Sequence, residues 1–308
     1  MAATGRHGSS ERSGDMRIGL VGNGYWARVT HAAGLQAAEP SVQLTGVWGR
    51  DLAKSQSLAA DLGVTAYDDV DRMFDDVDAV AFSVPPQVQS ELALRAARLG
   101  KHLLLEKPIA VTPEAAAELA AAVQEAGVAS VVFFTGRYDA GQRAWIEQTA
   151  ARTDWDAATG LWLGSAFATE SPFDTPWRRD KGGLWDVGPH ALAMLSGVLG
   201  PIEAITARAG RRDLVHLITE HASGASATYS VSIDAAPAAA VTSLSVWGPA
   251  GRTELAGGPS DAVGALATAA RELAAAAGQQ QPSHPLDVHF GRRVVELLAD
   301  AQAQLAKS

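Results

Sequence analysis

A lysine that follows an apolar run and precedes a proline is the residue of this chain best placed for chemistry. Residues 102–108 read His-Leu-Leu-Leu-Glu-Lys-Pro, and the proline biases the backbone of Lys107 toward an extended conformation. The run 102–105 predicts a strand, and ligands of open α/β sheets bind beyond the carboxyl ends of the strands. By itself Lys107 is a strand-terminal lysine, and most lysines are exposed and idle. Its role therefore depends on what the rest of the chain places beside it.

A second group of polar residues lies in segment 177–190. Asp186 fits an N-cap, and Pro189 is tolerated in the first turn of a helix, which places His190 one turn beyond Asp186 on the same helix face. A capping aspartate and a buried, hydrogen-bonded histidine would explain the pair without catalysis. Beside a bound dinucleotide, however, Lys107 and His190 are the acid–base partners that hydride transfer at a carbinol or carbonyl carbon requires.

A glycine-rich turn predicts the dinucleotide site that this chemistry needs. Residues 18–21 predict a strand, residues 25–38 predict a helix, and the segment between them reads G-x-G-x-x-A from Gly22 to Ala27. Gly22 permits a tight turn, and Gly24 lets the backbone approach a pyrophosphate. The phosphates would lie on the helix N-terminus, where N–H groups and the dipole favour anions. In this strand-turn-helix context the motif predicts dinucleotide binding.

Two further loops bear on how a dinucleotide is held. After the predicted strand 42–48, Arg50 stands where a cation would contact a 2′-phosphate, and Lys54 lies one helical turn further on. Asp51 is either a ligand of the NAD ribose or a plain N-cap, and Arg50 can also stack on adenine, which favours neither cofactor. We expect NADP(H), with NAD(H) as the alternative. Ser83, Pro85 and Pro86 end another strand with a rigid turn that either borders the nicotinamide riboside or is a mere loop.

The pattern of apolar runs divides the chain into two units. Short runs alternate with amphipathic stretches up to residue 134, which indicates βαβ units and a parallel sheet. Beyond it, strand-like runs follow one another, which indicates an antiparallel or mixed sheet. The predicted strands of this second part are 161–169, 202–209, 215–221, 226–233, 241–246 and 253–255, with helices at 140–152, about 187–198, 262–277 and 288–306. We therefore expect a disordered tail over 1–15, a dinucleotide-binding domain over 16–134 and an α+β domain over 135–308, whose last helix packs toward the first domain.

Composition excludes several classes of function. The formal net charge of −9 argues against nucleic acid or an anionic membrane as the main partner, and the absence of cysteine excludes disulfides and thiolate chemistry. Residues 1–15 are polar and no run is long enough for a membrane helix, so we expect a cytoplasmic protein. His284, Asp287 and His289 are best explained as a loop and a helix cap, and no metal is expected.

Three motifs together resemble the glucose–fructose oxidoreductase / inositol dehydrogenase / MocA (Gfo/Idh/MocA) family. They are Gly22-Asn23-Gly24-Tyr25-Trp26-Ala27, Glu106-Lys107-Pro108 and Gly183-Leu184-Trp185-Asp186-Val187-Gly188-Pro189-His190, the last matching D-x-G-x-H. Their order and spacing extend the resemblance over nearly the whole chain. It implies an N-terminal Rossmann domain and a C-terminal domain with a large, mostly antiparallel sheet.

The resemblance also implies roles for individual residues. Lys107, Asp186 and His190 would surround the substrate carbon that faces the nicotinamide, and the bond before Pro108 would be cis. The glycine-rich motif and Glu106 would contact the cofactor. Candidates for substrate contacts are Trp177, Arg178 and Tyr138. One departure is the segment 136–140, which reads Gly-Arg-Tyr-Asp-Ala where many members carry Arg-Phe and then a proline.

The expected activity is an NAD(P)-dependent oxidoreductase acting on a sugar, polyol or related small molecule, assembled as a homodimer or homotetramer. The resemblance suggests association through the open face of the C-terminal sheet, including strands within 226–247. Two alternatives use the same scaffold: oxidation of a trans-dihydrodiol or reduction of a non-sugar ketone, and a sensor that binds a dinucleotide without catalysis.

Overall fold

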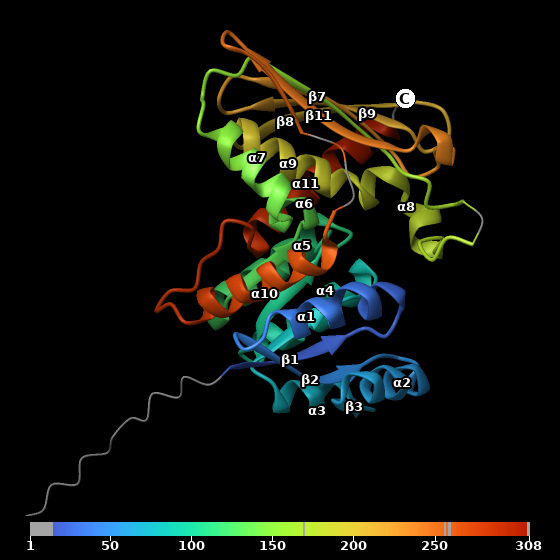
Figure 1. The fold of residues 1–308 in the computed structure, drawn as a ribbon, viewed down its shortest axis with the longest axis vertical. Helices are drawn as coiled ribbons and strands as arrows, with labels where there is room; N and C mark the ends of the chain where they lie inside the picture. Colours follow the sequence, from blue (N-terminus) through green and yellow to red (C-terminus); the bar gives the residue numbers. More distant parts are fainter. Residues whose placement is uncertain (1–14, 169, 256, 258–259, 307–308) are drawn as a thin grey trace, which may run out of the picture.

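The computed structural model describes residues 15–168, 170–255, 257 and 260–306 and shows two parts, each built on a six-stranded sheet. Figure 1 shows one sheet near the bottom of the molecule, the other at the top, and a layer of helices between them. The tail predicted for 1–15 lies almost wholly outside the described residues. No helix among the described residues is both long and apolar enough to cross a membrane.

The first sheet is parallel and has the strand order β3-β2-β1-β4-β5-β6. Its strands are β1 (Met16–Val21), β2 (Val42–Trp48), β3 (Thr65–Tyr67), β4 (Ala79–Phe82), β5 (His102–Glu106) and β6 (Ser130–Phe133). Its connecting helices are η1 (Ala27–Ala32), α1 (Ala33–Ala37), α2 (Leu52–Leu62), α3 (Val70–Asp76), α4 (Pro86–Arg98) and α5 (Pro113–Ala126). Because β1 pairs with both β2 and β4, the strand order reverses at β1, which is where Rossmann folds bind dinucleotides. The predicted Rossmann domain is confirmed.

The second sheet is mixed, with the order β12-β11-β7-β10-β9-β8. Its strands are β7 (Ala157–Leu163), β8 (Ile202–Ala209), β9 (Val215–His221), β10 (Ser226–Ser232), β11 (Val241–Gly248) and β12 (Gly251–Leu255). Only β7 and β10 pair in parallel among the described strand pairs of this sheet. The expectation of a large, mostly antiparallel sheet is therefore confirmed.

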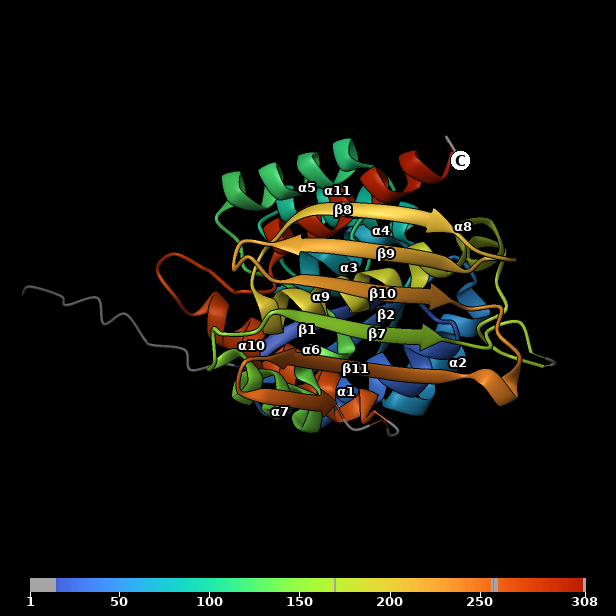
Figure 2. The same cartoon turned by 90° about the horizontal axis from the view of Figure 1, so that it is seen from above.

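This second sheet is covered on one face only. Along β9 the residues alternate strictly between buried and exposed, the pattern of a sheet with one solvated face. Figure 2 shows the strands with the helices behind them and no element in front. The short helix η2 (Pro237–Ala239) connects β10 to β11.

Six more helices pack between and around the sheets. They are α6 (Thr135–Tyr138), α7 (Ala140–Ala150), α8 (Pro176–Asp186), α9 (Gly188–Leu199), α10 (Ala262–Ala277) and α11 (Val288–Leu305). Helix α10 packs on α1, α6 and β6, while α11 packs on both α5 and β8. The last two helices thus join the parts, and the exact domain boundaries stay a prediction.

The structure corrects the predicted strand over 161–169. The strand begins at Ala157 and ends at Leu163, and a turn follows in which the Ala168 N–H donates to the Ser165 carbonyl. Apolar content alone does not separate a strand end from an apolar loop. Helices α3 and α8 were not predicted, and the charged, glycine-containing sequence of α8 (PWRRDKGGLWD) has no apolar period of 3.6 residues.

Candidate active site

The glycine-rich turn connects β1 to the helix that follows and uses its two glycines differently. Gly22 has φ 136°, and a Cβ there would lie 2.4 Å from the carbonyl oxygen of Ser83, so the close approach of β1 and β4 requires glycine. A Cβ on Gly24 would meet no atom within 4 Å. The space beside Gly24 is the open space that a pyrophosphate needs for close approach to the backbone. The turn therefore fits a dinucleotide.

Asn23 ties this turn to the end of β2. Its side-chain amide donates to the Asp51 carbonyl at 2.8 Å and to Ser55 Oγ at 2.9 Å. The Asp51 carboxylate is the N-cap of α2, accepting from the Lys54 N–H at 3.1 Å, and Lys54 Nζ lies 3.7 Å from it. Of the two readings of Asp51, the structure shows the cap. Arg50 is exposed, and its guanidinium has no hydrogen-bond or ion-pair partner in the part of the chain described.

Ser83, Pro85 and Pro86 lie at the carboxyl end of β4, beside the turn. The Ser83 N–H donates to the Val21 carbonyl at 2.8 Å, and Pro85 and Pro86 begin α4. The loop therefore lies at the sheet edge where β1, β4 and β5 end, as predicted.

Hydrogen bonds of the Glu106 carboxylate connect the glycine-rich segment to the end of β5. Its Oε1 accepts from Trp26 Nε1 at 2.8 Å and lies 2.9 Å from His31 Nε2, and Oε2 accepts from the Lys107 N–H at 3.2 Å. Burial by itself would raise the pKa of Glu106. Its net pKa is nevertheless lowered, because the hydrogen bond and charge of His31, the charge of Lys107 and the hydrogen bond of the Trp26 indole have the larger combined effect. The carboxylate is thus stably ionised and holds Trp26, His31 and the backbone of Lys107 together.

Lys107 is bound to an aspartate from the second part of the chain. Its Nζ donates to the backbone carbonyl of Asp186 at 2.7 Å and to Asp186 Oδ1 at 3.1 Å, while Arg178 Nε donates to Asp186 Oδ2 at 2.8 Å. Burial raises the pKa of Asp186, but the charges and hydrogen bonds of Lys107 and Arg178 more than offset this and lower it to about 2. Two cations therefore surround one carboxylate. The bond between Lys107 and Pro108 is cis, as expected.

The predicted N-cap role of Asp186 is wrong. Asp186 is the last residue of α8, and α9 begins at Gly188 with Val187 in the N-cap position and no side-chain cap. The sequence pattern of an aspartate before a helix could not show that the carboxylate would be taken by Lys107 and Arg178. Pro189 does lie in the first turn of α9, as predicted.

His190 lies in the first turn of α9 and is 8 % exposed. Burial lowers its pKa well below the usual value, and the positive charge of Lys107 acts in the same direction. Its Nδ1 is enclosed and has no hydrogen-bond partner in the described chain. The indole of Trp162, from β7, stacks on the imidazole with ring centroids 5.1 Å apart and planes 18° apart. Sequence reasoning missed Trp162, although strand alternation could have placed it on the same face as Ala158 and Gly160.

Two protein-family models match the two parts of this architecture. A family model described as an oxidoreductase family with an NAD-binding Rossmann fold matches residues 16–134, and the GFO/IDH/MocA C-terminal domain matches residues 159–254. Together they cover more than half of the chain. The chain belongs to the Gfo/Idh/MocA family.

Individual Gfo/Idh/MocA relatives are distant. The oxidoreductase YdgJ of Escherichia coli is 30 % identical over 198 residues, covering 58 % of this chain and 52 % of the relative. A dTDP-3,4-didehydro-2,6-dideoxy-alpha-D-glucose 3-reductase of Streptomyces violaceoruber is 28 % identical over 191 residues, covering 58 % and 53 %. The chain thus spans about half the length of these curated relatives. The crystal structure of GenD2 from gentamicin A biosynthesis in complex with NAD has a TM-score of 0.83 at 22 % identity, covering 99 % of this chain and 97 % of GenD2, a likeness of fold.

An aromatic contact joins the two parts of the fold above the glycine-rich turn. The ring of Phe173 meets Tyr25 edge-on at 5.8 Å and Trp26 at 6.0 Å between centroids. The guanidinium of Arg178 lies 5.3 Å from the Phe173 ring centroid. The glycine-rich segment and Arg178, which pairs with Asp186, thus share one neighbour, Phe173, which no sequence motif indicated.

Among the described residues, neither of the other two candidate substrate residues forms a hydrogen bond with Lys107 or Asp186. Tyr138 is 2 % exposed and lines a separate cavity of about 180 Å³ with Arg143, Glu272 and His284; its pKa is raised well above the usual value by burial. Trp177 packs against the core with its Nε1 enclosed and without a partner in the described chain. In the described part of the chain, Arg178 is the candidate that hydrogen-bonds to a predicted catalytic residue, Asp186.

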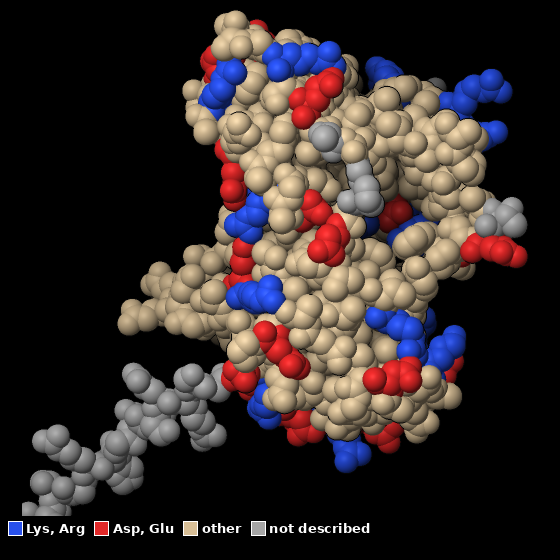
Figure 3. Space-filling view, in the orientation of Figure 1, with Lys and Arg blue, Asp and Glu red and all other residues tan. Residues whose placement is uncertain are grey.

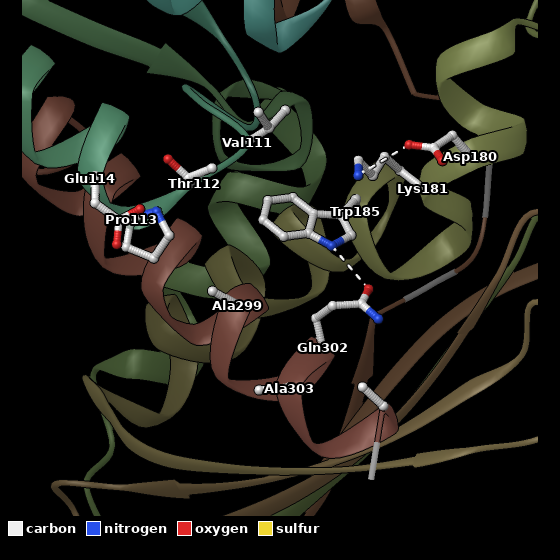
Figure 4. Close-up of a pocket in the computed structure, with 11 residues that line it drawn as sticks. Val111, Thr112, Pro113, Glu114, Asp180, Lys181, Trp185, Ala299, Gln302 and Ala303 are labelled. Carbon is white, nitrogen blue, oxygen red and sulfur yellow. Dashed lines mark hydrogen bonds and ion pairs between the residues drawn. The ribbon is translucent and has the colours of Figure 1, made fainter. Parts of the chain in front are cut away.

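A larger cavity lies beside Trp185, the residue that directly precedes Asp186. It has a volume of about 520 Å³ and is lined by the start of α5, by Asp180, Lys181 and Trp185 of α8, and by small residues of α11. Figure 4 shows the Trp185 indole donating to Gln302 and the ion pair of Lys181 with Asp180. None of Lys107, Asp186 and His190 lines it, so we do not assign it to the reaction. In Figure 3 the surface is hollowed between the two parts, and side chains of both charges are visible inside.

No group of three or more potential metal ligands occurs among the described residues. His284 pairs with Glu272 at 2.8 Å, and Asp287 caps α11 through the N–H groups of His289 and Phe290. The loop-and-cap interpretation of this segment is confirmed.

Proposed function

We propose that this protein is an NAD(P)-dependent dehydrogenase that interconverts a secondary alcohol and a ketone on a sugar or polyol. The observation that supports the proposal is the contact of Lys107, Asp186 and Arg178 at the carboxyl end of β5, which is separated by one strand, β4, from the strand that leads into the dinucleotide turn. His190 lies close enough to this cluster for its pKa to respond to each of the three charges. The bound nicotinamide supplies the hydride acceptor in oxidation and the donor in reduction.

His190 acts as the general base in oxidation. Because its pKa is well below the usual value, the imidazole is neutral at pH 7 and can accept a proton. Nδ1 is enclosed, so Nε2 is the nitrogen that takes the hydroxyl proton of the substrate, and it returns that proton in the reverse direction. A positioned group of this kind contributes about 10²–10⁴ in rate.

Lys107 stabilises the substrate oxygen. As an ammonium group it has three donors, and Asp186 accepts two of them, which leaves one for an oxygen on which negative charge develops. With Arg178 the cluster carries two positive charges and one negative charge, so its field favours an alkoxide. Asp186 fixes the direction of the ammonium group through two separate oxygens.

The substrate class is supported by the relatives. One is named a dTDP-sugar 3-reductase, and others are named UDP-N-acetylglucosamine 3-dehydrogenase and glucose-6-phosphate 3-dehydrogenase. Each name describes redox chemistry at a ring hydroxyl of a sugar. We propose the same class of position for the substrate of this chain.

The test is turnover by matched variants on a substrate panel. Free sugars, a sugar phosphate, a nucleotide sugar, an anhydrosugar and myo-inositol are assayed with NAD⁺ and NADP⁺. Lys107→Ala and His190→Ala should each lower kcat by at least about 10²-fold. The control is Lys101→Ala, since Lys101 lies at the opposite end of β5 and donates to the Val77 carbonyl. Near-normal turnover by either catalytic variant, or no turnover of any panel member by the wild type, would refute the assignment.

We further propose that NADP(H) is the preferred cofactor. The Asp51 carboxylate is occupied by the N-cap and by Lys54, whereas the exposed Arg50 has no partner among the described residues and is available to a 2′-phosphate. Arg50→Ala should weaken NADPH binding and leave NADH binding unchanged. Ligand-induced shifts in melting temperature report both affinities; equal shifts by NADPH and NADH in the wild type would count against the proposal.

We also propose that the protein is a homo-oligomer, assembled through the open face of the second sheet. This face carries four large apolar side chains that are more than a third exposed, namely Leu161, Ile218, Val241 and Trp247. They stand on β7, β9 and β11, which span most of the sheet. Ser and Thr side chains stand between them, such as Thr228 and Ser230 of β10, and we propose that a second copy of the chain covers this mixed surface.

A further inference from the structure

Among the described residues, none forms a hydrogen bond that orients the imidazole of His190. In acid–base histidines the second ring nitrogen is usually held by a carboxylate or a backbone carbonyl, which fixes the direction of the first. Here Nδ1 is enclosed and has no partner among the described residues. Something else must hold the plane of the ring.

Trp162 is in a position to do so. Its indole lies nearly parallel to the imidazole, 18° between planes and 5.1 Å between centroids. A stacked contact blocks rotation of the imidazole out of its plane but does not cover the ring edge that carries Nε2. The contact therefore sets the ring plane and leaves Nε2 available to a substrate.

The backbone that carries Trp162 is itself firmly held. Strand β7 is an interior strand, and Trp162 pairs with Val231 of β10 on one side and Thr242 of β11 on the other. Two residues earlier, Gly160 lies against the ring of Tyr229, where a Cβ would be 2.3 Å from Cε2. The indole thus extends from a closely packed part of the sheet toward α9.

We propose that Trp162 is a positioning residue for His190, acting through the stacked ring to fix the direction in which Nε2 meets the substrate oxygen. The inference deepens the proposed function and rests on His190 being the proton acceptor. Trp162 needs no contact with the reacting atoms in this role. Its effect on turnover must therefore pass through the imidazole.

A double-mutant cycle separates this role from a structural or substrate-binding one. Trp162→Leu should lower kcat by about 10–100-fold, the scale of a small misplacement of a catalytic group, with KM changed less than about 3-fold. Trp162→Phe keeps an aromatic face and should retain kcat within about 3-fold. In a His190→Ala background, Trp162→Leu should have no further effect, because the group that it positions is gone. The matched control is Trp145→Leu, since Trp145 is a half-buried tryptophan of α7 that donates to Thr253 of β12, and this variant should leave kcat unchanged.

The outcomes of the double-mutant cycle test the positioning role of Trp162 and the proposed function separately. An equal loss from Trp162→Leu with and without His190 would overturn the positioning role in favour of packing or substrate contact, as would a change confined to KM. Normal turnover by His190→Ala would instead refute the proposed function itself.

A second measurement requires no substrate. In proton NMR of the wild type, the His190 Hε1 signal, assigned by its loss in His190→Ala, should be displaced by the indole ring current. Trp162→Leu should abolish the displacement, and Trp162→Phe should retain part of it. A signal that does not move in Trp162→Leu, in a variant whose circular dichroism shows a folded protein, would overturn the inference.

Discussion

Replacing Asp186 by asparagine should remove a measurable part of the stability of the fold. The carboxyl pKa falls from 3.8 to about 2 on folding, and each pKa unit corresponds to about 1.36 kcal/mol, so the ionised carboxylate stabilises the folded state by about 2 kcal/mol. Asparagine also leaves the ammonium of Lys107 and the guanidinium of Arg178, both largely buried, without their counter-charge. We therefore expect Asp186→Asn to lower the free energy of unfolding by about 2–4 kcal/mol at pH 7.

The stability difference between wild type and Asp186→Asn should depend on pH in a definite direction. A carboxyl group whose pKa is lowered in the folded state contributes its stabilisation fully above the unfolded pKa, and loses it as the pH falls through the folded pKa. The difference between wild type and variant should therefore be constant near neutrality and shrink as the pH drops from about 4 toward about 2.

The assay is denaturant-induced unfolding of both proteins at a series of pH values. Asp154→Asn is the control, since Asp154 forms an exposed ion pair with Arg152 at 2.9 Å, and we expect a change within about 0.5 kcal/mol. The reasoning is refuted if Asp186→Asn unfolds with the wild-type free energy at pH 7, or if its deficit is the same at every pH.

Three further predictions follow from the packing. Gly24→Ala should keep the melting temperature of the apoprotein but weaken dinucleotide binding. Gly22→Ala should destabilise the fold by about 1–3 kcal/mol, because alanine at its positive φ is strained and its Cβ meets the Ser83 carbonyl. The reverse pattern in melting and binding curves would contradict the assigned roles. Glu106→Gln replaces an acceptor of three hydrogen bonds by an amide and should cost about 1–3 kcal/mol in denaturant unfolding, so an unchanged midpoint would show that these bonds do not form in solution. The double variant Leu161→Glu with Ile218→Glu should dissociate the oligomer without unfolding the chain, and sedimentation velocity that shows the same species as wild type would exclude this face as the interface.

Much of the framework was accessible to prediction because it depends on neighbours in sequence. The strands β2, β8 and β9 and the helix α10 have the predicted bounds. The helices α2, α5 and α10 each have a capping residue just before them: Asp51, Thr112 and Asp261 accept backbone hydrogen bonds at the three N-termini. Apolar periodicity and capping are local signals. The helix α8 was not predicted, because it contains Gly182, which has φ 63°, and lacks an apolar stripe.

The sequence by itself determined that a glycine-rich turn follows a strand, that a lysine ends another strand before a proline, and that a histidine follows an aspartate by four residues. Only the tertiary structure decided what these side chains do, because their partners are remote in the chain. Asp186 looks like a helix cap in sequence, but it meets Lys107 across 79 residues. The resemblance assigns Glu106 to the cofactor, yet in the structure its carboxylate accepts a hydrogen bond from Trp26, 80 residues away. The stacking of Trp162 on His190 likewise arises only where an interior strand of one sheet faces the first turn of a helix. Such contacts follow from packing, and no local pattern of residue types encodes them.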